Sequence, residues 1–86
     1  MATRFIVRGR VQGVGYRMFV LRTAEDRGWK GEVWNRRDGA VELVVAGVDP
    51  AEVRAALERG PGQVDAVIEE TAPEPNFEGF SVGPTR

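Results

Sequence analysis

The sequence predicts an α+β domain of the ferredoxin-like kind, a βαββαβ (split βαβ) order in which two helices cover one face of an antiparallel sheet. Three observations predict it. Strand-like and helix-like hydrophobic patterns follow one another in that order, an Asp-Gly turn joins two of the strands, and no repeat or linker interrupts the chain. With 86 residues and 42% hydrophobic side chains, the chain can bury one compact core. We therefore expect residues 1–86 to form a single domain.

The first strand and the first helix are predicted by two different periods. Alternate positions are apolar or glycine, as in a strand with one buried face: Phe5, Val7, Gly9 and Val11. After a short turn, a second set recurs at three- and four-residue intervals, as on one face of a helix: Tyr16, Phe19, Val20, Thr23 and Ala24. Gly28 is then a natural end for this helix.

A β-hairpin is predicted next. Residues 30–35 read as a second strand, and Val41 to Ala46 as a third. The Arg36-Arg37-Asp38-Gly39 segment between them has the Asp-Gly pair that favours a tight hairpin turn.

The second helix has the clearest start signal in the chain. Asp49 suits the N-cap, Pro50 suits the first helical position, and Glu52 is placed to close a capping box. The helix is expected to bury one apolar face and to end at Gly60-Pro61-Gly62; that face consists of Val53, Ala56 and Leu57.

The remaining segments complete the sheet. Val64 to Glu70 reads as a fourth strand, followed by a proline-containing loop, Thr71 to Gly79, and a short fifth strand, Phe80 to Val82. The sheet face without helices is expected to be partly open; it carries Arg8, Trp34 and Glu42 among others. We expect Trp34 to cover this face rather than to contact a ligand.

The turn between the first strand and the first helix can present donors to an anion. Gly13 and Gly15 permit positive φ, so successive backbone N–H groups can curl around one point, and the helix start adds unpaired N–H groups. Arg17 adds a planar cation that matches two phosphate oxygens. The plainer interpretation is a tight turn beside a solvated arginine. A Walker A loop and a dinucleotide fingerprint are both excluded, because the Gly-Lys-Ser/Thr ending and the third glycine are absent.

Composition restricts the available chemistry. The chain has no His and no Cys, so it has no imidazole base, thiol nucleophile or conventional zinc site, and Ser81 has no histidine to activate it. An enzyme of this composition would work by positioning and electrostatics, as in phosphoryl transfer. No apolar run is long enough to span a bilayer, and the first residues lack the apolar stretch of a signal peptide, so we expect a cytoplasmic protein.

Charge is distributed unevenly along the chain. Residues 1–37 hold nine basic and three acidic side chains, a net charge of +6, whereas residues 38–86 carry a net charge of −7. The glycine turn lies in the basic half, which would attract small anions. The alternative is that most of these charges are solvated and mix in space once the chain folds.

Three features of the chain occur together: the run from Gly9 to Arg17, Asn35, and the Asp38-Gly39-x-Val41-Glu42 segment. Through these residues the chain closely resembles the acylphosphatase family over essentially its whole length. The joint occurrence of Val-Gln-Gly-Val-x-Tyr-Arg and Val-x-Asn-x-x-Asp-Gly at this separation is highly specific.

This resemblance implies hydrolysis of the carboxyl-phosphate bond of small acyl phosphates to a carboxylate and inorganic phosphate, without a metal or cofactor. It implies that Arg17 binds the phosphate, that Asn35 orients the attacking water, and that backbone amides complete the phosphate site at Gln12, Gly13, Val14, Gly15, Tyr16 and Arg17. The first two strands of a split βαβ run in the same direction, so Asn35 is expected to face Arg17. We expect a monomer with no nucleic-acid or membrane partner.

Two other functions remain open at this point. An RNA-recognition module shares the βαββαβ order, but its aromatic signature fails where this chain has Val14, Arg17 and Met18. A non-catalytic phosphate sensor would keep the glycine turn but would not need a residue that positions water, so Asn35 favours the enzyme.

Overall fold

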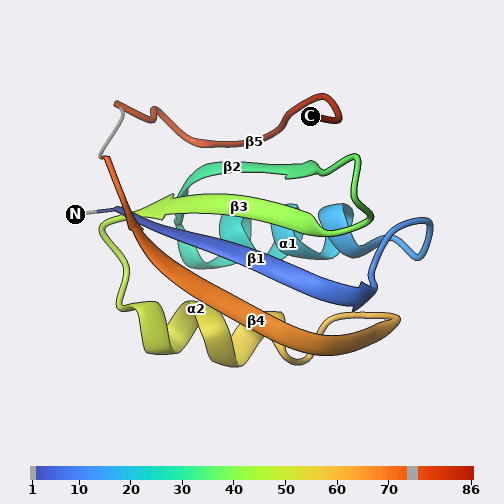
Figure 1. The fold of residues 1–86 in the computed structure, drawn as a ribbon. Coiled ribbons are helices and arrows are strands. Elements are labelled where there is room, and N and C mark those ends of the chain that lie inside the picture. Colours follow the sequence, from blue (N-terminus) through green and yellow to red (C-terminus); the bar gives the residue numbers. More distant parts are fainter. Residues whose placement is uncertain (1, 74–75) are drawn as a thin grey trace.

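The computed structural model describes residues 2–73 and 76–86 (Figure 1). The strands are β1 (Ala2–Arg10), β2 (Lys30–Asn35), β3 (Val41–Ala46), β4 (Gln63–Ala72) and β5 (Phe80–Val82), and the helices are α1 (Tyr16–Arg27) and α2 (Pro50–Leu57). The predicted order of elements and the short fifth strand are therefore confirmed. Positions 74 and 75 of the predicted loop lie outside the described residues.

The five strands form one sheet in the order β4-β1-β3-β2-β5. Strands β1 to β4 pair antiparallel, as predicted, whereas β5 pairs parallel to β2 and makes the sheet mixed. The reason is directional: β4 runs opposite to β2 and therefore ends where β2 begins. A segment that leaves β4 and crosses the sheet at that end enters the far edge running in the same direction as β2. Strand β5 is therefore parallel to β2. Strands β1 and β2 both oppose β3, so they run the same way and end at the same side of the sheet.

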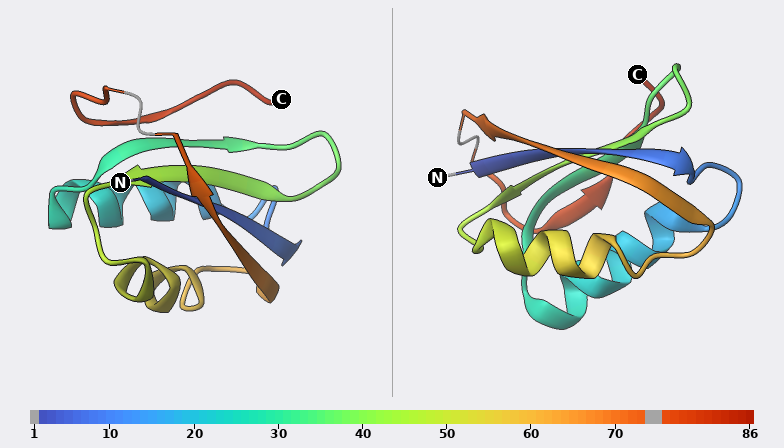
Figure 2. Two further views of the ribbon diagram at one scale, coloured as in Figure 1. Left: turned by 60° about the vertical axis from the view of Figure 1, so that its left-hand side comes forward. Right: turned by 60° about the horizontal axis from the view of Figure 1, so that its bottom comes forward.

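Both helices pack on one face of the sheet (Figure 2). The main core lies between the helices and the sheet. It includes fully buried residues of both layers: Phe5, Val7 and Leu43 of the sheet, Tyr16 of α1 and Leu57 of α2. None of the helices in the described parts of the chain is long and apolar enough to cross a membrane.

The opposite face of the sheet is more covered than expected. Trp34 is only 7% exposed and packs with Val44, Ala72 and Phe77 in a second apolar cluster, and the Arg86 guanidinium lies 4.3 Å from the centre of its ring. The expectation that Trp34 covers this face is confirmed. Of the charged residues expected here, Glu42 forms ion pairs with Arg4 at 2.9 Å and with Arg36 at 3.2 Å, and Arg8 lies 3.5 Å from Asp38.

The helix ends agree with the sequence in part. Gly28 ends α1, and Asp49 caps α2 by accepting a 2.9 Å hydrogen bond from the Ala51 N–H. The predicted capping box is wrong, because Glu52 accepts the indole N–H of Trp29 at 3.2 Å instead. Trp29 is nearly fully buried, so leaving its indole N–H without a partner would cost more free energy than leaving an exposed N–H at the helix start to water. Helix α2 ends at Leu57, before the Gly60-Pro61-Gly62 segment, and β4 extends beyond its predicted limits at both ends.

Candidate active site

The turn between β1 and α1 has the backbone that its glycines permit. Gly13 and Gly15 have φ values of 74° and 82°, in the left-handed region where a Cβ is unfavourable. Gly15 is the N-cap of α1 and has no side chain with which to cap it, and the first turn of the helix contains no acidic residue. The N–H groups at this helix start can therefore turn toward an anion.

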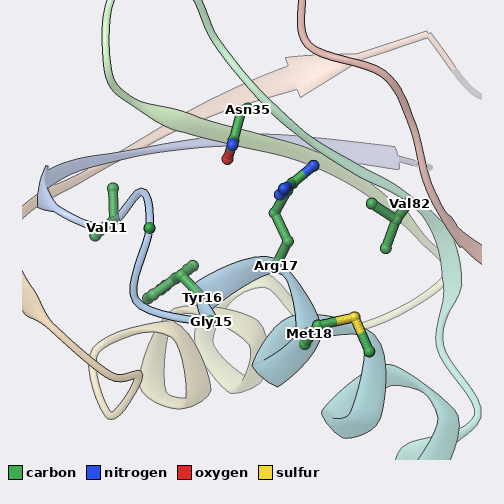
Figure 3. A pocket seen from close by; sticks show the side chains of 8 residues that line it. Val11, Gly15, Tyr16, Arg17, Met18, Asn35 and Val82 are labelled. Atoms are coloured by element: carbon green, nitrogen blue, oxygen red, sulfur yellow. The ribbon is translucent and has the colours of Figure 1, made fainter.

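A pocket of about 180 Å³ joins this turn to the end of β2 (Figure 3). It brings together five of the seven predicted site residues, namely Gly13, Gly15, Tyr16, Arg17 and Asn35. The other lining residues are Val11, Met18 and Val82. The pocket exists because β1 and β2 end at the same side of the sheet, which places the last residue of β2 opposite the first turn of α1.

Arg17 and Asn35 both extend into the pocket, Arg17 from the first turn of α1 and Asn35 from the end of β2 (Figure 3). The Asn35 Oδ1 atom is buried and has no hydrogen-bond partner among the described residues. Leaving a buried acceptor without a partner costs about 1–3 kcal/mol, so such an atom calls for an explanation. Within the same residues, no hydrogen bond or ion pair holds the Arg17 guanidinium.

The side chain of Tyr16 belongs to the core rather than to the pocket chemistry. Its hydroxyl donates a 2.6 Å hydrogen bond to the Leu57 carbonyl, and its ring packs against Gly60. Burial raises the pKa of the phenol well above its ordinary value, because the charged form would be desolvated. Only the backbone of Tyr16 is left to serve a ligand.

Gln12 and Val14, the other two predicted residues, do not line the pocket. The Gln12 side chain donates to the backbone carbonyls of Arg36 at 2.7 Å and Ala40 at 2.9 Å, and so ties the glycine turn to the β2–β3 hairpin. Val14 packs against the main core. The prediction for these two positions concerned their backbone amides, and it stays a prediction.

The backbone of Asn35 is fixed by a segment that sequence reasoning did not connect with the site. The Arg86 N–H donates to the Asn35 carbonyl at 2.9 Å, and the Arg86 carbonyl accepts from Arg37 N–H at 2.9 Å. Gly83 N–H likewise donates to the Val33 carbonyl at 2.8 Å. The pairing that β5 starts thus continues to the end of β2 at Asn35. No pattern in residues 83–86 indicates this, and nothing in the sequence alone placed Met18 or Val82 at the pocket.

The fold and this pocket define a class of protein: an α+β domain in which a glycine turn and a helix start form a pocket suited to an anion. Among the described residues, neither the Arg17 guanidinium nor the Asn35 Oδ1 atom in this pocket has a partner. Within the described residues, no group of three or more His, Cys, Asp or Glu side chains is arranged to hold a metal ion.

Comparison with known proteins identifies the family. Residues 3–82 match the family model described as Acylphosphatase. An acylphosphatase of Rhodopseudomonas palustris is 51% identical over 71 residues, covering 78% of this chain and 72% of that protein. One from Pasteurella multocida is 46% identical over 84 residues, covering 92% and 93%. The crystal structure of acylphosphatase from Bacillus subtilis superposes with a TM-score of 0.81 at 38% identity, covering 95% of this chain and 97% of that one.

The chain belongs to the acylphosphatase family, whose members are enzymes that hydrolyse acyl phosphates. The resemblance in the sequence is thereby confirmed. The RNA-binding and phosphate-sensing alternatives are not favoured.

Proposed function

We propose that the pocket between Arg17 and Asn35 is where this chain hydrolyses small acyl phosphates, and that it does so without a metal. The observation that carries this proposal is the buried Asn35 Oδ1 atom, which has no partner among the described residues and shares a pocket with the Arg17 guanidinium. An acceptor in that position can accept a hydrogen bond from water and hold it beside an anion bound at the glycine turn.

The phosphate end of the substrate would be bound by charge and by backbone donors. The guanidinium of Arg17 donates to two phosphate oxygens, and the backbone N–H groups of residues 12–17 donate to the others. The positive end of α1 adds to the field. These groups neutralise the negative charge of the phosphate, which a metal ion would otherwise do. This is the basis for proposing that no metal is needed.

The chemistry then follows from placement. The water held by Asn35 attacks phosphorus, the bond from phosphorus to the bridging oxygen breaks, and its electron pair leaves on the carboxylate. A carboxylate has a pKa near 4, so it departs as an anion and requires no general acid. The proton from water ends on a phosphate oxygen, which gives inorganic phosphate and the free carboxylate. This assignment uses no histidine, in agreement with the composition.

We also propose that the enzyme is a monomer, that it acts on small molecules in the cytoplasm, and that it binds neither nucleic acid nor membrane. The pocket is complete within one chain, so the proposed chemistry does not require a second copy. Acyl phosphates carry charge and cross a bilayer poorly, so the enzyme would lie in the compartment where they form.

Hydrolysis of benzoyl phosphate tests this function. We expect turnover well above the spontaneous rate, unchanged when EDTA is added and inhibited competitively by inorganic phosphate. Turnover no faster than in buffer would contradict the enzyme assignment. Turnover abolished by EDTA and restored by a divalent cation would contradict metal independence.

The role of Asn35 is tested by Asn35→Ala. We expect kcat to fall about 10²- to 10³-fold, as when a single transition-state hydrogen bond is removed, while the inhibition constant for phosphate stays unchanged. Asn76→Ala is the matched control, because Asn76 is exposed and outside the pocket. Normal turnover by the Asn35 variant would show that another group positions the water.

A further inference from the structure

Residues 83–86 lead from β5 toward the β2–β3 hairpin and lie beside the end of β2 (Figure 1). Among the described residues, the backbone hydrogen bonds that this segment donates to β2 come from the Gly83 N–H and the Arg86 N–H, and the second reaches the Asn35 carbonyl. Pro84 has no N–H, and residues 84–86 are exposed. A segment with few and exposed hydrogen bonds opens locally at little cost in free energy. Its backbone alone is therefore a weak support for Asn35.

The Arg86 side chain adds two contacts that hold the segment against β2. Its guanidinium lies 4.3 Å from the centre of the Trp34 ring, and its Nη2 atom lies 2.9 Å from Glu32 Oε2. Trp34 is itself fixed, since it packs in the second apolar cluster with only 7% of its surface exposed. A ring face and a carboxylate each attract a cation, and here both act on one guanidinium. We refer to these two contacts together as the Arg86 latch.

Gly83 leaves the space that the latch occupies. A Cβ at this position would collide with the Glu32 carboxylate and would press on the Arg86 guanidinium. The backbone of Gly83 is outside the left-handed region, so its conformation does not require glycine. The lack of a side chain at Gly83 therefore matters for the close approach of Glu32 and Arg86.

The latch and the pocket lie on opposite faces of β2. Glu32 and Trp34 are two residues apart and share the open face of the sheet, whereas Val33 and Asn35 alternate with them and face the helices. Arg86 does not line the pocket, so any effect on the reaction has to pass through the backbone that it holds. The ladder between β5 and β2 covers Gly31 to Val33 and stops short of Asn35. On this side of β2, the Asn35 backbone is thus supported by Arg86.

We propose that Arg86 is a positioning residue for hydrolysis: its latch holds residues 83–86 against β2 and so fixes the backbone from which the Asn35 amide reaches the water. This proposal rests on the proposed function of the pocket. A small misplacement of the amide lowers the rate, because the water then lies off the line of attack on phosphorus. Phosphate affinity is unaffected, since Arg17 and the glycine turn belong to other elements.

The first test removes the latch with Arg86→Ala, which keeps the backbone N–H and carbonyl of residue 86. We expect kcat for benzoyl phosphate to fall by about fivefold to tenfold, while the inhibition constant for inorganic phosphate stays unchanged. Arg86→Lys keeps a cation that can lie over Trp34 and pair with Glu32, so it should restore kcat to within about threefold of the wild type.

Arg37→Ala is the matched control. Arg37 lines the same hollow on the open face as Arg86, but its side chain makes no hydrogen bond or ion pair with the described residues. Its removal takes one guanidinium from this surface without touching the latch. We expect this variant to have wild-type kcat and wild-type inhibition by phosphate.

A double variant shows whether the effect passes through Asn35. In the Asn35→Ala background, Arg86→Ala should change the residual kcat by less than about twofold, because the amide that the latch positions is gone. Hydrogen exchange at the Arg37 N–H, which donates to the Arg86 carbonyl, reports release of the segment without any substrate. We expect this exchange to become faster in Arg86→Ala.

An unchanged kcat in Arg86→Ala, or an equal loss in the Asn35→Ala background, would overturn the positioning role. A parallel weakening of phosphate inhibition would indicate general damage to the pocket and would also overturn it. Unchanged exchange at the Arg37 N–H would show that the latch does not hold the segment. Failure of the wild type to hydrolyse benzoyl phosphate would instead overturn the proposed function, and the role of Arg86 with it.

Discussion

Arg17 combines two properties that can be separated by substitution. Its guanidinium supplies positive charge, and it also supplies a planar fork with two parallel donors. It lines the pocket and, within the described residues, is engaged by no other side chain. We expect a phosphate group to require both properties.

Arg17→Lys keeps the charge and removes the fork. We expect kcat/KM for benzoyl phosphate to fall by about 10²-fold or more, with weaker inhibition by inorganic phosphate, because an ammonium group cannot make the paired contact. Arg22→Lys on the exposed side of α1 is the control and should have wild-type kinetics. Near-normal kinetics for the Arg17 variant would mean that charge alone suffices.

Tyr16 lies in the same motif but has a different role. Its hydroxyl donates to the Leu57 carbonyl inside the core. Tyr16→Phe should therefore lower the free energy of unfolding by about 1–3 kcal/mol, the usual range for leaving a buried acceptor without its partner, and should leave kcat unchanged. Urea unfolding and the hydrolysis assay measure the two effects. A large loss of kcat at unchanged stability would assign the hydroxyl to catalysis.

At the scale of elements, the site depends on how the glycine turn, the β2–β3 hairpin and residues 83–86 are joined. The hairpin was predicted to the residue, because its Asp-Gly turn and both strand patterns are local. The link through the Gln12 side chain was not, since a glutamine beside a glycine turn gives no sign of a partner more than twenty residues away. The contact between Arg86 and the Asn35 backbone escaped prediction for the same reason.

Gln12→Ala tests the link between turn and hairpin. The Gln12 amide holds two backbone carbonyls of the hairpin, at Arg36 and Ala40. We expect the loss of these hydrogen bonds to lower the free energy of unfolding by about 1–2 kcal/mol. We also expect kcat to fall by a larger factor than phosphate inhibition weakens, because Arg17 stays with the glycine turn while Asn35 moves with the hairpin. Gln63→Ala is the control, because the side chain of Gln63 bonds only the exposed Asp65 among the described residues. Equal kinetics for the two variants would show that the pocket aligns without this tether.

At the scale of the whole molecule, the order and direction of the main strands were easier to predict from the sequence than the edge strand β5 or the lining of the pocket. The order of elements and the shared direction of β1 and β2 follow from hydrophobic periods and short connections, and they suffice to bring Asn35 to Arg17. The parallel pairing of β5 depends on where a long crossover enters the sheet, and three residues of strand carry too little pattern to show it. Membership of the pocket is a property of the assembled sheet and helix, which is why Met18 and Val82 appeared only in the structure.

The groups with shifted pKa values place the pH limits of stability far from neutrality. Hydrogen bonding to Arg36 lowers the pKa of Asp38, so its contribution to stability is present above the unfolded pKa and is lost as pH falls toward the acid range. Burial raises the pKa of Tyr16, so the stability linked to its neutral form is present below the unfolded pKa of about 10 and is lost as pH rises beyond it. Neither change falls in the range where the enzyme is expected to work.

We therefore expect kcat for benzoyl phosphate to be flat between about pH 7 and pH 9. No His or Cys side chain is present to titrate in that range, and the Asn35 amide does not ionise. On the acid side, kcat should fall only as the dianionic substrate phosphate gains a proton, at or below the pKa of about 6 of a phosphate ester, because that phosphate accepts the proton from water. A pH–rate series with stability followed in parallel measures this. A bell-shaped profile centred near neutrality would place an ionising protein group in the reaction and would contradict the mechanism proposed for Asn35.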